Sequence, residues 1–103
     1  QQERGWQVSK GWVGSARAGQ PSRFRVKVLE RDGAPVRFAE VGGVFERPSD
    51  SRLDQPFRLK ETGPGVYEGE LVLPEPGAWV LVLQIRRGEQ LHEVHARTSV
   101  DEG

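Results

Sequence analysis

Apolar and polar residues alternate along much of the chain, most clearly over residues 65–85. Side chains two residues apart in a strand point to the same face, so this alternation predicts strands with one buried face. Two such runs, 66–73 and 78–86, flank a Pro-Glu-Pro-Gly connector that has no helical pattern. Their apolar positions form the predicted centre of the core: Tyr67, Leu71, Leu73, Trp79, Leu81, Leu83 and Ile85.

The same alternation predicts further strands on both sides of this stretch. They cover residues 6–13, 23–30, 36–45, 57–61 and 91–100. Gly42 and Gly43 suggest a bulge, a bend or a division into two short strands within the third of these. Turns are predicted at residues 31–35, 62–65 and 87–90, and a long polar loop at residues 46–56.

No stretch has helical periodicity, and seven or eight short strands separated by regular turns predict an all-β protein. We expect an antiparallel immunoglobulin-like β-sandwich, although a jelly roll or a small barrel would share the pattern. A chain of 103 residues is long enough for one such domain, over residues 6–103. Residues 1–5 form a polar lead-in.

The charges of the chain cancel, with 15 basic and 15 acidic residues. A neutral domain has no general attraction to nucleic acid, so we expect no nucleic-acid partner. The absence of cysteine excludes disulfides, a thiolate nucleophile and the common structural zinc sites. No apolar run approaches the ~20 residues of a membrane helix, and the first residue is not Met. The sequence therefore does not decide whether a membrane anchor lies upstream of Gln1.

No nucleophile elbow, phosphate-binding loop or other catalytic motif frames the polar residues. We expect no catalytic residue, no cofactor and no enzyme activity. His92 and His95 are the weak candidates for a metal site, but residues three apart on a strand point to opposite faces. They converge on one ion only where a bulge lies between them. Copper also favours Met or Cys beside His, and both residue types are absent from the chain. A copper-handling domain that uses the two histidines is therefore only the alternative hypothesis.

Val80 and Val82 are the first candidates for partner binding. They lie on the face of their predicted strand opposite Trp79 and Leu81. This strand is therefore either covered on both faces or carries an exposed apolar patch that binds another protein. The alternation alone does not decide between the two.

The polar loop and the start of the chain supply the other candidates. Arg47, Asp50 and Arg52 belong to the loop, where opposite charges lie close together and favour mutual compensation. Trp6 is a candidate because an amphipathic indole suits the boundary with a membrane or a partner. Trp6 or Trp12 would also serve the alternative of a surface- or carbohydrate-binding module.

One predicted strand carries a basic face, formed by Arg23, Arg25 and Lys27. Such a face suits a phosphate or an acidic partner. Acidic residues on neighbouring strands favour a ladder of opposite charges across the sheet instead.

Several landmarks follow one another in order along almost the whole chain. They are Gly5-Trp6, Asp32-Gly33-Ala34-Pro35-Val36, Arg47-Pro48, Gly65-Val66-Tyr67-Glu68-Gly69 and Pro76-Gly77-Ala78-Trp79-Val80-Leu81. In this combination the sequence resembles the FixH-like family, also called CcoH. The resemblance implies a single-pass protein of the bacterial inner membrane, with an N-terminal helix and a β-sandwich on the periplasmic side. That helix would lie upstream of Gln1, so residues 1–5 would lead in from a removed anchor.

The resemblance also implies a function. Members of the family assist the assembly or stability of cbb3-type cytochrome c oxidase, and they are linked to nitrogen-fixation and copper-transport gene clusters. They are not enzymes. We therefore expect a non-catalytic accessory domain whose partners are membrane oxidase subunits or other assembly factors. The matched Gly, Pro, Tyr and Trp positions look like turn and core determinants, and the resemblance supplies no catalytic residue.

Overall fold

Seven antiparallel strands make up most of residues 5–102, which are the residues described by the structure, a computed structural model. The strands are β1 (Gln7–Val13), β2 (Pro21–Leu29), β3 (Glu40–Glu46), β4 (Gln55–Gly63), β5 (Val66–Val72), β6 (Gly77–Arg87) and β7 (Gln90–Val100). A single 3₁₀ turn, η1 (Ser51–Leu53), lies between β3 and β4. Within the described residues, no helix has the length and apolar character needed to cross a bilayer. The predicted all-β class is confirmed.

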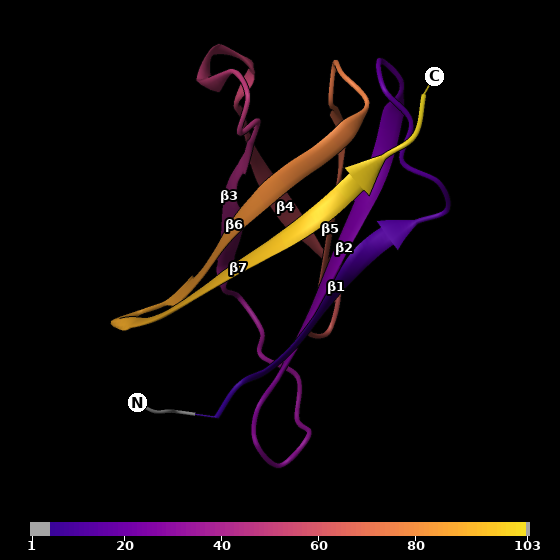
Figure 1. Ribbon diagram of the computed structural model, residues 1–103. Helices are drawn as coiled ribbons and strands as arrows, with labels where there is room; N and C mark the ends of the chain where they lie inside the picture. The colour runs from indigo at the N-terminus through magenta and orange to yellow at the C-terminus, as the bar shows by residue number, and fades with distance from the viewer. Residues whose placement is uncertain (1–4, 103) are drawn as a thin grey trace.

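The strands form two layers (Figure 1) in the order β1-β2-β5-β4-β3-β6-β7. Strands β1, β2, β5 and β4 in one layer and β3, β6 and β7 in the other match the arrangement of a constant-type immunoglobulin domain. Strand β4 joins the layers, because residues 55–59 pair with β3 whereas residues 60–63 pair with β5. A strand that changes partners in this way makes the corner of a sandwich. The predicted immunoglobulin-like sandwich is confirmed with seven strands.

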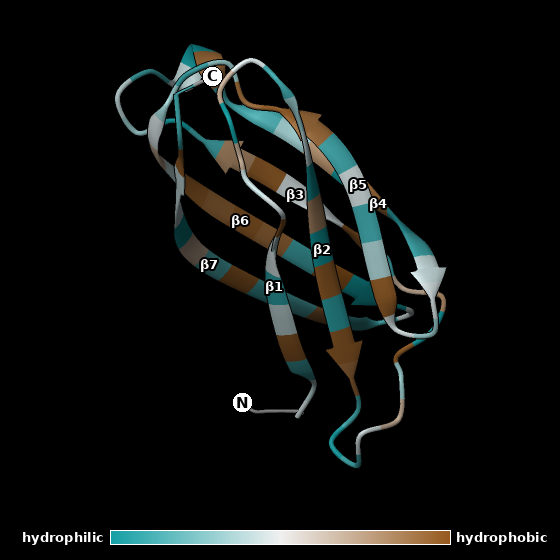
Figure 2. Cartoon of the chain, turned by 90° about the vertical axis from the view of Figure 1, so that its right-hand side faces the viewer, coloured by the Kyte–Doolittle hydropathy of each residue, from teal (hydrophilic) through white to brown (hydrophobic). Residues whose placement is uncertain are grey.

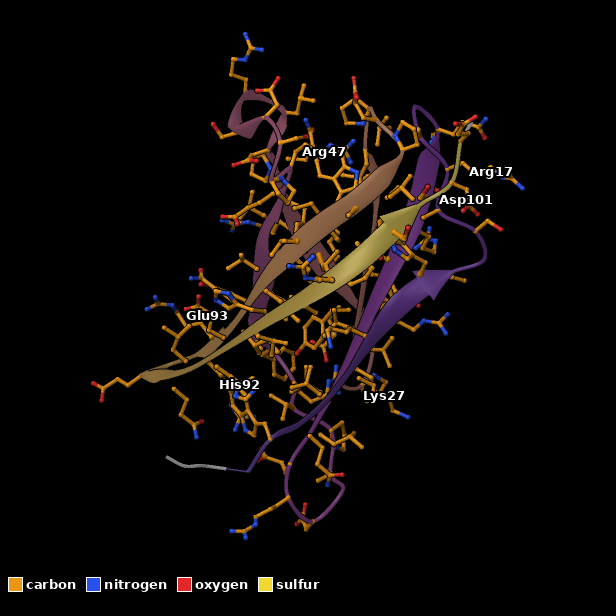
Figure 3. All side chains as sticks on the ribbon, in the orientation of Figure 1. Arg17, Lys27, Arg47, His92, Glu93 and Asp101 are labelled. Carbon is orange, nitrogen blue, oxygen red and sulfur yellow. The ribbon has the colours of Figure 1, made fainter. Side chains whose placement is uncertain are left out.

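The two edge strands, β1 and β7, face each other across the open side of the sandwich (Figure 1). Beyond β1 the chain makes a parallel bridge between Arg17 and Asp101, which Figure 3 labels together. Further along this edge, the indole Nε1 of Trp12 donates a hydrogen bond of 2.9 Å to Oγ1 of Thr98. A short bridge and side chains thus close this edge in place of a continuous ladder.

Apolar side chains from both layers fill the interior, as the alternating bands of hydropathy along the strands show (Figure 2). Most of the predicted core positions are buried, and Trp79 on β6 is 0% exposed. Leu71 is only partly buried and packs at the margin of this core. The indole Nε1 of Trp79 donates to the backbone oxygen of Glu75 at 2.9 Å, so its polar atom is satisfied inside the fold.

Four aromatic rings from four strands meet in the core. Phe45 on β3 lies at the centre, with its ring centroid 5.4 Å from that of Trp12, 5.4 Å from that of Phe24 and 5.0 Å from that of Phe57. Aromatic pairs at this spacing contribute beyond the area they bury, by about 0.5–1.5 kcal/mol each. The alternation predicts a strand for each ring but does not predict that the four rings meet.

Two predicted boundaries are wrong. The strand expected over residues 36–45 begins at Glu40, because Phe38 has left-handed backbone with a φ of 62° and cannot continue a strand. The polar loop is shorter than expected, since β4 already begins at Gln55 and contains Pro56. Proline is tolerated there because this half of β4 pairs on one side only, with β3. The lead-in at residues 1–5 lies outside the described residues except for Gly5.

The Gly42-Gly43 pair lies within one continuous strand, with neither a bulge nor a division. The ladders from β3 to β4 and from β3 to β6 both run through these glycines without a register shift. Gly43 has a φ of 154°, and a Cβ atom there would collide with the carbonyl oxygen of Val82. Only glycine therefore fits where β3 passes β6 at the corner of the sandwich.

Replacing this glycine should be costly. We expect Gly43→Ala to lower the free energy of unfolding by roughly 3 kcal/mol, from backbone strain and displacement of β6. Gly11→Ala in β1 is the matched control, since nothing lies within 4 Å of its added Cβ, and it should change stability by less than about 1 kcal/mol. Urea denaturation of both variants measures the difference, and equal stabilities would contradict the role of Gly43.

Candidate functional site

Val80 and Val82 lie on the outer face of the layer formed by β3, β6 and β7. Both side chains are half-buried, whereas the alternate residues of β6 point into the core. In the ladder, Val82 lies between Val44 of β3 and His95 of β7. The two valines thus form a short, partly exposed apolar row, which is neither a second core nor a broad apolar patch.

A shallow depression of about 320 Å³ lies on the same outer face, over β4, β3 and the end of β6. Gly42 contributes no side chain at this place, and Pro56 and Leu91 supply apolar surface. Leu91 is 51% exposed. Its charged lining residues are Glu40, Arg58 and Arg86. The depression is therefore a polar-rimmed hollow on a sheet and not an enclosed pocket.

Arg47 is engaged within the fold. Its Nη1 donates to the backbone oxygen of Ala78 at 3.0 Å, and its guanidinium carbon lies 5.1 Å from the ring centroid of Trp79. Its backbone N–H donates to Oδ1 of Asp54 at 2.9 Å. Figure 3 shows the residue beside the first turn of the loop. Arg47 therefore fixes the loop to β6, and only part of its surface is available to a partner.

Asp50 and Arg52 compensate each other, as the sequence suggests. Nη2 of Arg52 lies 2.9 Å from Oδ2 of Asp50, and the backbone N–H of Arg52 donates to Oδ1 of the same carboxylate. The hydrogen bonds from Arg52 lower the pKa of Asp50 below its ordinary value. The Asp50 side chain also caps the 3₁₀ turn η1, so the pair holds the shape of the loop.

Trp6 packs against the core at the beginning of β1. The guanidinium of Arg87 lies 5.4 Å from one of its ring centroids, and the ring of His92 is 6.4 Å away. Arg87 is held in turn by an ion pair of 2.9 Å with Glu30. Trp12 lies within the aromatic cluster of the core. Arg87 thus lies over one face of the Trp6 ring, and both indoles are half-buried.

The two histidines point to opposite faces of β7. The ladder between β6 and β7 is unbroken over the whole of β7, so no bulge lies between them. His92 is half-buried near Trp6, whereas Nε2 of His95 lies 2.7 Å from Oε2 of Glu93 on the outer face (Figure 3 labels His92 and Glu93). Among residues 5–102, no three His, Cys, Asp or Glu side chains are grouped so that they could hold a metal ion. The two imidazoles do not converge on one ion.

Two of the three residues of the basic face on β2, Arg23 and Arg25, pair with acids of β5 as predicted, whereas Lys27 makes no ion pair among residues 5–102. Glu68 accepts from Arg23 at 3.0 Å and from Arg25 at 2.7 Å, and Glu70 lies 4.0 Å from Arg23. The hydrogen bond from Arg25 is the main reason that the pKa of Glu68 is lowered. Each such exposed pair contributes little to stability, but together they leave this face with much of its charge neutralised.

A further feature is the segment of residues 36–39 between β2 and β3, which the alternation of apolar and polar residues does not single out. The hydroxyl of Tyr67 donates to the backbone oxygen of Val36 at 2.6 Å and accepts from the backbone N–H of Ala39 at 3.1 Å. Burial raises the pKa of this phenol above its ordinary value. A buried tyrosine needs a hydrogen-bond partner for its hydroxyl. The presence of Tyr at a predicted core position is therefore the one sequence signal that this residue does more than fill the core.

Glu61 holds the same segment from the other side. Its Oε1 accepts from the backbone N–H of Phe38 at 3.0 Å, and its Oε2 accepts from Nε of Arg37 at 2.8 Å and from the N–H of Gly65 at 3.2 Å. These contacts fix Phe38 in left-handed backbone, which costs about 1–2 kcal/mol for a residue with a Cβ atom. Its ring is nevertheless 78% exposed. Phe38 is thus held in place without contributing to the core.

Comparison with known families agrees with the landmarks in the sequence. The profile of the FixH family matches residues 1–99. The chain belongs to the FixH family. The match covers β1 to β6 completely and all of β7 except its last residue. The sandwich is therefore the FixH domain itself. A search of proteins with curated descriptions gave no match.

The carboxylate of Glu61 should make stability depend on acid pH. Its pKa lies below the ordinary value of 4.5, mainly because it accepts the hydrogen bond from the Phe38 N–H. A lowered folded-state pKa stabilises the fold above about pH 4.5, and this contribution is lost as the pH falls through the folded pKa. We expect Glu61→Gln to be less stable than the wild type at pH 7, with the difference shrinking towards pH 3. Denaturant unfolding across this range measures it.

The matched control is Glu89→Gln, in the exposed turn between β6 and β7. This variant should follow the wild type at every pH. A difference between Glu61→Gln and the wild type that stayed constant down to pH 3 would show that the carboxylate charge is not what holds the segment.

Proposed function

We propose that this domain is a non-catalytic accessory domain that assists the assembly or stability of a cbb3-type cytochrome c oxidase through protein–protein contacts. It would be held on the periplasmic side of the bacterial inner membrane by a helix upstream of Gln1. Its partners would be oxidase subunits or other assembly factors. The observation that carries the proposal is the FixH match over residues 1–99, which covers almost the whole domain.

The electrostatics favour binding over catalysis. The acidic groups whose pKa is shifted are Asp50, Glu61 and Glu68, and each shift comes from hydrogen bonds within the fold. Each of these carboxylates holds a loop or a sheet face, and they lie on different parts of the surface. Acid–base catalysis needs titratable groups that converge on one reacting centre. These three carboxylates instead accept hydrogen bonds within the fold, which is a structural role.

The association can be tested with the full-length, membrane-anchored protein. We expect an affinity-tagged copy, solubilised in detergent, to retain cbb3 oxidase subunits, and a deletion strain to contain several-fold less assembled oxidase. Immunoblots of the eluate and spectra of the membranes measure the two effects. Normal oxidase levels in the deletion strain, together with an eluate free of oxidase subunits, would exclude the proposal.

The apolar row on β6 is a candidate contact for this association. We expect the double variant Val80→Thr, Val82→Thr to reduce the retained oxidase several-fold, because each hydroxyl replaces a methyl group at the partly exposed row without changing side-chain shape greatly. Val72→Thr is the control, since Val72 is 45% exposed on β5 of the other layer. Equal retention by both variants would remove the row from the contact surface, provided that urea denaturation finds both folded.

A further inference from the structure

Strand β7 is the last strand of its layer, and it has a strand partner on one side only (Figure 1). The loop between β6 and β7 is the two-residue turn Gly88-Glu89, so its closing pair, Arg87 and Gln90, exchanges both backbone hydrogen bonds. Bonded and non-bonded pairs then alternate along the ladder. The even-numbered residues of β7 therefore bond to β6, and the odd-numbered residues point their N–H and C=O groups away from it.

The backbone of Asp101 agrees with this alternation. Its N–H donates to the oxygen of Ala16 at 2.9 Å, and its oxygen accepts from the N–H of Ala18 at 2.8 Å. Within residues 5–102, no backbone hydrogen bond joins another segment to the odd-numbered residues from 91 to 99. We call residues 91–99 the free edge of β7. Such a row of open donors and acceptors is a template for a further strand.

The free edge lacks the features that protect strands at the edge of a sheet, which are shortness, proline, bulges and inward-pointing charges. Strand β1 has seven residues, and Lys10 stands on its inward face opposite Val26 of β2. Strand β7 has eleven residues, contains no proline and pairs with β6 without a bulge. Its inward positions from 92 to 98 are His, Val, Ala and Thr. No charge on that face opposes a further strand.

The outward positions of β7 carry the charges that decide which strand fits. Glu93 and Arg97 are exposed on this face, with His95 midway between them. Nε2 of His95 lies 2.7 Å from Oε2 of Glu93, which leaves Oε1 of Glu93 for another donor. Arg97 makes no ion pair among residues 5–102. An acid and a base placed symmetrically about one residue match an antiparallel copy of the same strand.

The face of each side chain limits the registers in which two copies of β7 can pair. Opposed residues must lie on the same face, so the two-fold axis passes through a residue. Centres at Glu93 or Arg97 would place like charges directly opposite each other, which is destabilising. Centres at Val94 or Ala96 would leave both charges without an oppositely charged partner. The centre at His95 alone sets each Glu93 opposite Arg97 of the second copy.

We propose that the chain forms a symmetric dimer in which the free edge of β7 pairs with the free edge of a second copy. The strands run antiparallel about a two-fold axis at His95, and the layers of β3, β6 and β7 from both copies join into one sheet. Glu93 and Arg97 form two ion pairs across the axis. The ladder ends at residues 91 and 99, because residues 16–18 occupy the edge at Asp101.

The dimer goes beyond the accessory role, because it concerns how copies of this chain associate with one another. The two are judged separately. Oxidase retention by a variant that no longer dimerises leaves the accessory role intact. A domain that dimerises without retaining oxidase counts against that role and not against the dimer.

Sedimentation equilibrium of the chain tests the dimer. The measured mass should rise with concentration from 11.5 kDa towards twice that value. Glu93→Arg should weaken the association by about tenfold or more, because it sets an arginine opposite Arg97 of the second copy. Adding Arg97→Glu should restore the association, because both ion pairs then form with their signs reversed. Arg58→Glu, exposed on β4, is the control and should associate like the wild type.

Three results of this experiment would overturn the proposal. They are a mass of 11.5 kDa at every concentration, a dimer that Glu93→Arg leaves unchanged, and a double variant that stays as weak as Glu93→Arg. The substituted side chains are exposed, and urea denaturation checks that each variant is folded.

A single introduced cysteine reports the register, since the chain contains none. At the axis, residue 95 of each copy belongs to a hydrogen-bonded pair with Cα atoms about 5.5 Å apart, which a disulfide can span. Oxidised His95→Cys protein should therefore run as a covalent dimer. Leu91→Cys is the matched control on the same face, because its two copies lie roughly 27 Å apart. Equal yields from both positions, or no covalent dimer from position 95, would overturn the proposal.

Discussion

The sandwich depends on one strand that passes between its two layers and on a close approach of backbones in the strand beside it. Strand β4 pairs first with β3 and then with β5, so the chain must turn from one layer into the other along a single strand. Beside this strand, β3 pairs with both β4 and β6, and Gly43 leaves the space for the pairing with β6 because no Cβ atom lies between it and Val82. Once the corner is made, the inner faces of both layers meet. The aromatic cluster around Phe45 and the buried Trp79 then fill the interior.

The same arrangement determines what remains outside. Because the apolar side chains of β2 point inwards, its outer face carries charged residues, and the neighbouring β5 brings opposite charges beside them. Glu68 with Arg25 and Asp50 with Arg52 are each satisfied inside the chain. Other charged side chains, such as Lys27 and Lys60, make no ion pair among residues 5–102. The apolar side chains that the fold leaves partly unused are the β6 valines and Phe38.

Local pattern was sufficient to predict much of this fold. The two-residue period of apolar positions predicted the strands and the burial of Trp79. The same period placed the two histidines on opposite faces and favoured the charge ladder on β2. It failed where distant residues override local preference. Phenylalanine is not among the residues that favour left-handed backbone. Nothing in the sequence around Phe38 therefore indicates that β3 begins only at Glu40. The cause is Glu61 and Tyr67, more than twenty residues away. The contacts of Arg47 with Ala78 and Trp79 are long-range in the same way.

The position of the chain's first described residues bears on which surface meets a membrane partner. Gln7 donates to the backbone oxygens of Glu30 and Arg31, so the start of β1 lies against the β2–β3 connection that carries Phe38. Figure 1 shows this connection and the start of β1 at one end of the molecule, and the loop of residues 47–54 at the other. With an anchor upstream of Gln1, as we propose, the end that carries Phe38 would be nearest the membrane. A subunit embedded in that membrane would then reach Phe38 before it reached Asp50 or Arg52, whose charges are in any case satisfied by each other. Under this proposal, contact at the membrane-proximal end is the most economical arrangement, and the loop of residues 47–54 would face away from the membrane.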